Sequence, residues 1–151
     1  MQPTSPRTSA PSKDGSPLSA AVSSRDQNIL AMVRKSLEDN SAVLAFQPVI
    51  DSRRPERAAF YEALIRVIDD TGRIIPARDF IEVCETDEIG RMIDCLSLQL
   101  GLKTLAEAPR LRLSVNMSAR SIGYPRWMAT LEKGLAADPT LGERLIIEIA
   151  N

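Results

Sequence analysis

The stretch that decides the fold is FYEALIRV, residues 60–67, an apolar run that carries one acid and one base. Side chains alternate between the two faces of a strand, so Glu62 and Arg66 share one face and the other face is apolar. A carboxylate in such a strand needs a metal, a base or several donors to compensate its charge. Two interpretations are open at this point: an ion pair between Glu62 and Arg66 at a sheet edge, or a functional site.

The composition predicts a single soluble domain without a strong electrostatic field. The chain has 151 residues, of which 44% are hydrophobic, enough for one core. It contains no apolar run of the roughly 18 residues that a membrane span needs, and its start lacks a hydrophobic signal region. We therefore expect a cytoplasmic protein with no membrane partner. The 19 basic residues nearly balance the 20 acidic ones, which argues against nucleic acid as a partner.

The absence of histidine narrows the chemistry that the sequence can perform. It excludes Ser-His-Asp and Cys-His catalysis and any zinc site built on histidine. The two cysteines, Cys84 and Cys95, show no CxxC spacing, and we expect reduced, buried thiols. Any chemistry must come from carboxylates, amides, lysine or arginine.

The sequence divides into a tail, a lead helix and a domain. Residues 1–24 hold seven Ser and four Pro with few large apolar groups, which predicts a disordered tail. Apolar residues at helical spacing then predict one amphipathic helix over residues 26–38, within a lead segment 25–40. The remainder, residues 41–151, is the expected folded domain.

Strands and helices alternate in the expected domain. The pattern predicts strands over residues 44–51, 60–67, 111–116 and 145–150, with a polar turn over residues 51–57. It predicts helices from Pro76, over residues 88–107, and from Pro125 to Asp138. Because Pro48 lacks an N–H, the first strand belongs at an edge or a bulge. This alternation is typical of an α/β fold with a mostly parallel sheet and helices outside it.

Polar side chains recur near the ends of the predicted strands. Asn116 and Glu148 each lie opposite an apolar face, as Glu62 does, and Gln47 holds a comparable place on the first strand. The carboxyl ends of parallel strands are where α/β folds assemble sites, so Glu62, Asn116 and Glu148 are expected to meet. Two carboxylates and an amide oxygen favour Mg²⁺ or Mn²⁺. Arg66, about 13 Å beyond Glu62 at the usual strand rise, is placed to hold a phosphate.

Five segments, in this order and spacing, carry a resemblance to a known family: FQPV at 46–49, EAL at 62–64 followed by Arg66, the segment 76–81, SVNMS at 114–118 and IEI at 147–149. From about Leu44 to Asn151 the sequence resembles the EAL domain, a family of bacterial phosphodiesterases of cyclic di-GMP. The resemblance implies a (β/α)₈ TIM-like barrel that binds two Mg²⁺ or Mn²⁺ ions and cleaves cyclic di-GMP to linear pGpG. By position, it makes Glu62, Asn116 and Glu148 metal ligands, and it places Gln47 and Arg66 against the substrate.

The sequence also departs from the family. A paired-Asp motif, a Lys beside the attacking water and a later Glu and Gln are not found in these 151 residues, and Asn151 stands where a second Glu is usual. A complete barrel needs about 250 residues, of which residues 44–151 supply less than half. We therefore expect the N-terminal portion of an EAL domain, with no complete catalytic set, at most weak cyclic di-GMP binding, and no hydrolysis by this chain alone.

Three interpretations of that incomplete set remain open. The chain is the front part of an enzyme whose site a complementing C-terminal half completes, a non-catalytic module that binds a nucleotide or a protein, or a truncated gene product. Since half a barrel leaves a strand edge unpaired, a homo-oligomer is a further partner to consider.

Overall fold

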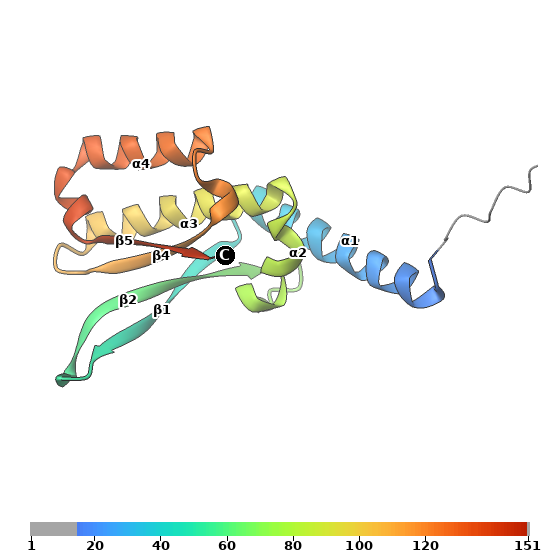
Figure 1. Cartoon of the computed structure of the whole chain (residues 1–151), viewed down its shortest axis with the longest axis horizontal. Coiled ribbons are helices and arrows are strands. Elements are labelled where there is room, and N and C mark those ends of the chain that lie inside the picture. Colours follow the sequence, from blue (N-terminus) through green and yellow to red (C-terminus); the bar gives the residue numbers. More distant parts are fainter. Residues whose placement is uncertain (1–14, 151) are drawn as a thin grey trace, which may run out of the picture.

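The computed structural model describes residues 15–150 (Figure 1). Its helices and strands follow one another in the order α1 (Pro17–Glu38), β1 (Ala42–Asp51), β2 (Arg54–Ile68), β3 (Ile74–Pro76), α2 (Ile81–Glu85), α3 (Glu88–Glu107), β4 (Leu113–Ser118), α4 (Pro125–Ala137) and β5 (Leu145–Ala150). Three short 3₁₀ helices lie between them: η1 (Ala77–Asp79), η2 (Ala119–Ser121) and η3 (Pro139–Glu143).

One mixed sheet organises the fold. Its strand order is β1-β2-β4-β5, with β3 beside β2. Strands β2, β4 and β5 run parallel, as the alternation of strands and helices predicts, whereas β1 and β3 run antiparallel to β2. The antiparallel pairs follow from short connections, because a parallel pair needs a crossover of a dozen or more residues. The edge position predicted from Pro48 is confirmed, since β1 ends the sheet.

The hairpin of β1 and β2 is longer than the sequence predicts. Residues 54–57, expected in a polar turn, belong to β2, and Asp51 pairs directly with Arg54. The turn is closed locally, because the carboxylate of Asp51 accepts the backbone N–H of Arg53 at 2.9 Å. The polar composition was misleading here because the hairpin end extends away from the helices and is exposed on both faces (Figure 1).

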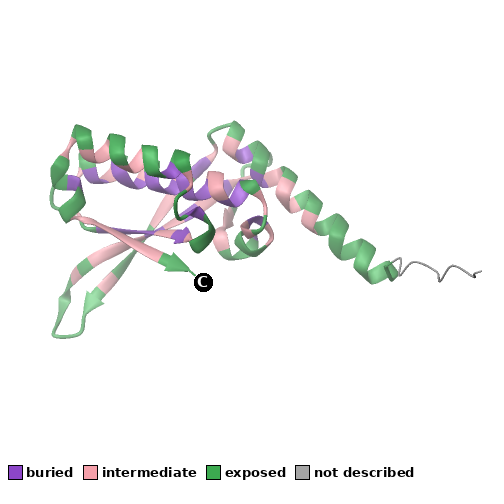
Figure 2. Cartoon of the chain, turned by 45° about the horizontal axis from the view of Figure 1, so that its top comes forward, coloured by how far each residue is buried: buried purple, intermediate pink, exposed green. Residues whose placement is uncertain are grey.

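The two faces of β2 differ as the alternation predicts. Ala63, Ile65 and Val67 are buried, while Glu62 and Arg66 are half-buried. The buried face lies against α3, and α4 lies beside α3 (Figure 2). We call the opposite face of the sheet the inner face; cross-strand pairing places on it Gln47, Glu62, Arg66, Ser114, Asn116 and Glu148.

Two apolar clusters hold the elements together. The first joins α3, α4 and η3 to the sheet through Ala63, Cys95, Leu98, Leu102, Leu105, Leu113, Val115, Met117, Trp127 and Leu141. The second joins α1, α2 and the start of α3 to β1 and β2 through Val33, Ala42, Ile65, Val67, Phe80, Cys84, Ile89 and Ile93. Both cysteines are free and buried, as expected.

Helix α3 matches the predicted bounds at both ends. The carboxylate of Asp87 caps its first turn by accepting the N–H of Ile89 at 2.9 Å. Pro109 follows directly after the C-cap, Ala108, and cannot continue the helix. Within residues 15–150, neither α3 nor any other helix is long and apolar enough to cross a membrane.

Helix α1 corrects one prediction. It begins at Pro17, so residues 17–24 are helical although the sequence places them in a disordered tail. The hydroxyl of Ser16 accepts the N–H of Ser19 at 3.2 Å, and proline suits the first helical position. A high content of Ser and Pro predicts disorder, but Ser at the N-cap and Pro at the first helical position also start helices. The helix ends at Glu38, the predicted last helical residue of the lead segment 25–40, and residues 1–14 of the expected tail lie outside the described residues.

Candidate functional site

Strand β4 brings Asn116 to the inner face of the sheet. The strand begins at Leu113, two residues later than predicted, because Leu111 still belongs to a turn in which its N–H bonds to Ala108 O at 3.0 Å. It then continues to Ser118. Asn116 therefore lies inside the strand, where it pairs with β5, and not at the strand end that the sequence predicts.

Four of the five predicted site residues adjoin one another. The side-chain amide nitrogen of Asn116 donates a hydrogen bond of 3.0 Å to Oε1 of Glu62. Glu148 is the register partner of Asn116 on β5, and Gln47 is the register partner of Glu62 on β1. Glu62, Asn116 and Glu148 are half-buried and Gln47 is exposed. The inner face thus gathers two carboxylates and two amides from four strands.

Arg66 lies on the same face, four residues further along β2. Its register partners are Val43 on β1 and Pro76 on β3. The ion pairs found within residues 15–150 do not include Glu62 with Arg66, so the interpretation of these two residues as a simple ion pair is wrong. The guanidinium of Arg66 therefore forms no ion pair with the carboxylate of Glu62.

The donor set fits a hard cation. Because the amide nitrogen of Asn116 is engaged with Glu62, its oxygen is left as the acceptor, next to the carboxylates of Glu62 and Glu148. Oxygen donors of this kind suit Mg²⁺ and Mn²⁺. Residues 15–150 contain no group of three or more His, Cys, Asp or Glu side chains that could hold a metal, so water or substrate oxygens would have to complete the coordination.

Two polar residues near the site escaped the sequence reasoning. Ser114, the register partner of Glu62 on β4, is fully buried and its hydroxyl has no hydrogen-bond partner among the described residues. Asp94 is a buried carboxylate on α3. The sequence signal for Asp94 is an acid within a largely apolar helix face.

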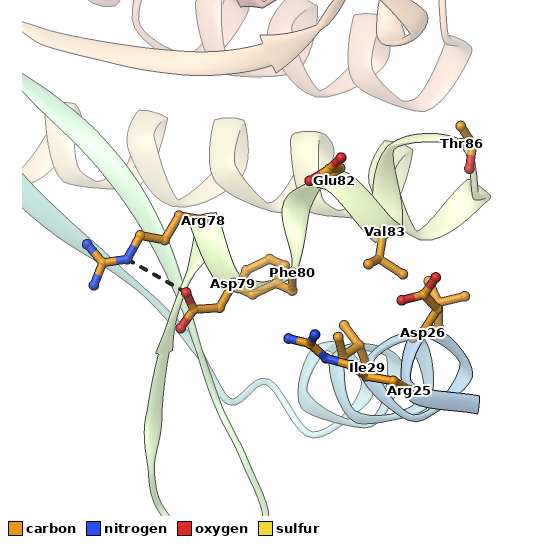
Figure 3. A pocket seen from close by; sticks show the side chains of 10 residues that line it. Arg25, Asp26, Ile29, Arg78, Asp79, Phe80, Glu82, Val83 and Thr86 are labelled. Atoms are coloured by element: carbon orange, nitrogen blue, oxygen red, sulfur yellow. Dashed lines mark ion pairs between the residues drawn. The ribbon is translucent and has the colours of Figure 1, made fainter. Parts of the chain in front are cut away.

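A separate groove of about 670 Å³ lies between α1 and the η1–α2 segment (Figure 3). Its lining includes charges of both signs and the ion pair between Arg78 and Asp79, whose atoms are 3.6 Å apart. Its lining contains none of the residues predicted for the site. The groove is therefore not the site that the sequence predicts.

Comparison with known proteins identifies the family. The EAL domain model matches residues 30–151. The EAL domain of FimX from Pseudomonas aeruginosa, bound to c-di-GMP, is 28% identical, covers 81% of this chain and 50% of that chain, and has a TM-score of 0.66. The corresponding domain from Xanthomonas citri, in complex with c-diGMP, has a TM-score of 0.73 at 22% identity, over 87% of this chain and 52% of that chain.

A curated relative also matches. An uncharacterized 76.5 kDa protein in the phbC 3' region of Thiocystis violacea is 29% identical over 124 residues, which cover 80% of this chain and 17% of that protein. The chain thus spans about half the length of the two solved domains and a smaller share of the curated relative.

These matches confirm the predicted fold class. The β2-β4-β5 strands and their helices form part of a TIM-like EAL architecture, in the mixed α/β arrangement described above. Solved domains of similar fold include a phosphodiesterase in complex with c-di-GMP and domains bound to c-di-GMP. Since the family model spans most of the sequence, the chain belongs to the EAL-domain family.

Proposed function

We propose that the inner face of the sheet binds cyclic di-GMP together with a divalent cation. The observation that carries this proposal is the hydrogen bond of 3.0 Å between Asn116 and Glu62, with Glu148 in register beside them. In this proposal, three separate strands present oxygen donors to one cation. The FimX domains, similar in fold, are bound to the same nucleotide, which supports this choice of ligand.

Each residue has a distinct part in this proposal. Glu62, Glu148 and the amide oxygen of Asn116 hold Mg²⁺ or Mn²⁺, a cation that polarises a phosphate and lowers the pKa of a bound water. Gln47, opposite Glu62 in the register, contacts the nucleotide. Arg66, on the same face of β2, pairs with a phosphate oxygen that the cation does not reach.

Hydrolysis requires more than these residues provide. Three protein oxygen groups leave about half of the six positions around Mg²⁺ to water or ligand, so we expect weak cation binding. Of the lysines within residues 15–150, Lys35 lies on α1, Lys103 on α3 and Lys133 on α4, and none is on a strand of the sheet. We therefore propose that the 151-residue chain by itself binds cyclic di-GMP weakly and does not cleave it.

A cytoplasmic location is consistent with this role. Cys84 and Cys95 are free thiols, as is usual for proteins kept in a reducing compartment.

The cation is tested first, without the nucleotide. Titration of the chain with Mn²⁺, followed by electron paramagnetic resonance of the free ion, should give weak binding that falls at least tenfold in Glu62→Ala. The matched control is Glu56→Ala, which removes an exposed carboxylate from the far end of the same strand. Equal affinity in wild type and Glu62→Ala would remove Glu62 from the proposed site.

The nucleotide is tested with fluorescent cyclic di-GMP in the presence of Mg²⁺. Binding should weaken in Arg66→Ala and persist in Arg54→Ala, which removes an exposed arginine near the hairpin turn of β2. Chromatography of unlabelled nucleotide incubated with the chain should show no linear pGpG. Cleavage that depends on Mg²⁺ and disappears in Glu62→Ala would overturn the claim that this chain is a binding module only.

A further inference from the structure

A buried polar network lies directly behind the part of β4 that carries Asn116. Asp94, on the second turn of α3, is only 5% exposed. Its Oδ2 accepts the backbone N–H of Ser118 at 3.0 Å and also accepts the hydroxyl of Ser121. Ser118 is the last residue of β4, two positions after Asn116. The carboxylate thus binds the end of the strand and the η2 turn that follows it.

The network extends to the end of α2. Arg91 donates from Nε to the hydroxyl of Ser121 at 2.7 Å and from a terminal nitrogen to the carbonyl of Glu85 at 3.1 Å. The hydroxyl of Ser118 donates to the carboxylate of Glu85 at 3.2 Å. Five residues from α2, α3 and the β4–η2 junction are therefore tied together at the C-terminal end of β4.

The position of Asp94 is costly for a carboxylate. Burial raises the pKa of Asp94, although hydrogen bonds from Ser121 and Ser118 and the charge of Arg91 oppose this rise. An apolar side chain at this position of α3 would pack against its neighbours without the cost of removing a charged carboxylate from water. What an apolar side chain cannot supply is an acceptor for the N–H of Ser118.

The N–H of Ser118 needs the Asp94 acceptor because Ser118 lies beyond the last residue of β4 that pairs with β2. Pairing of β4 with β2 stops at Val115, whereas pairing with β5 continues to Ser118. The last residues of β4, including Asn116, therefore have a neighbouring strand on one side only. On the side of β2, two other hydrogen bonds replace the missing backbone pairing between strands. One joins Ser118 to Asp94, and the other joins Asn116 to Glu62.

We propose that Asp94 is a positioning residue for the inner-face site: by fixing Ser118 it fixes the end of β4, and so directs the amide of Asn116 toward Glu62. The part of this proposal that concerns ligand affinity rests on the proposed function. The part that concerns the geometry of Asn116 does not, since the Asn116–Glu62 bond is present without any ligand. The two parts are therefore tested by different measurements.

The geometry is tested by NMR on the 151-residue chain. The side-chain amide resonances of Asn116 are expected to shift and to exchange faster with solvent in Asp94→Ala, as the bond to Glu62 loosens. Asp94→Asn keeps a carbonyl acceptor for Ser118 and should restore both properties. The control is Leu105→Ala, a core truncation in the last part of α3, which lowers stability but should leave the Asn116 amide unchanged.

The affinity is tested by Mn²⁺ titration of the same variants. Loss of a residue that orients a ligand typically costs about 10- to 100-fold in metal affinity, so Asp94→Ala should weaken binding by at least tenfold while Leu105→Ala does not. If wild type binds no Mn²⁺, the proposed function fails, and the amide resonances still decide the geometry.

A second variant covers the case in which Asp94→Ala does not fold. Ser121→Ala removes the other partner of Asp94 without altering β4, and a smaller shift of the Asn116 amide is expected. Unchanged Asn116 resonances in folded Asp94→Ala, or in Ser121→Ala where Asp94→Ala does not fold, would overturn the proposal.

Discussion

The side-chain amide of Asn116 on β4 donates a hydrogen bond of 3.0 Å to the carboxylate of Glu62 on β2, across 54 residues of sequence. The bond runs diagonally across the sheet, because the register partner of Glu62 is Ser114. It compensates a half-buried carboxylate, and it holds Asn116, the register partner of Glu148, against Glu62. One contact therefore links two interior strands of the sheet and joins two residues of the proposed site.

A double-mutant cycle measures that contact. Asn116→Ala and Glu62→Ala should each lower the free energy of unfolding, and the double variant should lose less than the sum of the two, by a coupling of about 1 kcal/mol. Urea denaturation of the four proteins gives the four values. The same cycle on Glu56 and Asn116, which are not in contact, is the control and should be additive. A coupling near zero for the Glu62 pair would contradict the hydrogen bond.

The sequence predicted best those elements whose ends carry local signals. Asp87 and Pro109 bound α3 at the predicted residues, and Pro125 opens α4 as predicted. Secondary structure was predicted less well where the only guide was the content of Ser, Pro and charged residues. The Ser and Pro content predicts a disordered tail where Ser16 and Pro17 start a helix, and the polar composition predicts a turn where residues 54–57 form a hairpin. In both cases exposure to solvent, and not lack of structure, explains the polar residues.

The site was predictable to the extent that it depends on strand alternation. Alternation is a local property, so it placed Glu62 and Arg66 on one face correctly, and the parallel order β2-β4-β5 then set Asn116 beside Glu148. The network behind β4 was not predictable in this way. Asp94 meets Ser118 and Ser121 only through the packing of α3 against the sheet, which depends on contacts 24 and 27 residues apart.

Gly90, in the first turn of α3, should not tolerate a side chain. A Cβ at this position would lie 2.5 Å from the carbonyl oxygen of Cys84, part of the backbone at the end of α2. Since a backbone atom cannot move aside as a side chain does, Gly90→Ala should lower the free energy of unfolding by about 1–3 kcal/mol. Thermal unfolding monitored by circular dichroism measures the change.

Gly134 on α4 is the matched comparison for Gly90. There the added Cβ would meet the end of the Leu102 side chain at 2.7 Å, which is able to rotate away. The higher helix propensity of alanine, worth roughly 1 kcal/mol, then offsets the crowding. Gly134→Ala should therefore be nearly neutral. If Gly90→Ala lowered the free energy of unfolding no more than Gly134→Ala does, α2 would approach α3 less closely than described.

Cys84 should make stability fall at alkaline pH. Burial, with a further contribution from Asp87, raises the pKa of Cys84 to about 11, whereas an unfolded chain has a cysteine pKa of about 8.5. The folded state therefore keeps the proton longer than the unfolded state does. The stabilising effect is complete below the unfolded pKa and is lost as pH rises toward 11, at about 1.4 kcal/mol for each unit within that window.

Comparison with Cys84→Ala isolates this effect from other groups that titrate in the same range. The difference in unfolding free energy between wild type and variant, measured by urea denaturation, should shrink as pH rises from 8 to 10.5. A difference that stays constant over this range would show that Cys84 does not titrate with the predicted pKa.

The exposed edge of β5 should drive self-association of the 151-residue chain. Within residues 15–150, β5 is the last strand of the sheet, and Ile149 near its end is 52% exposed. An apolar edge strand offers unpaired backbone groups to another copy, and a lysine on such an edge opposes pairing. Ile149→Lys should therefore shift the chain toward monomer in size-exclusion chromatography with light scattering. Ile122→Lys, at an even more exposed isoleucine outside any strand, should leave the distribution as in wild type. A wild-type chain that is monomeric at high concentration, or equal effects of the two lysines, would exclude β5 as the associating edge.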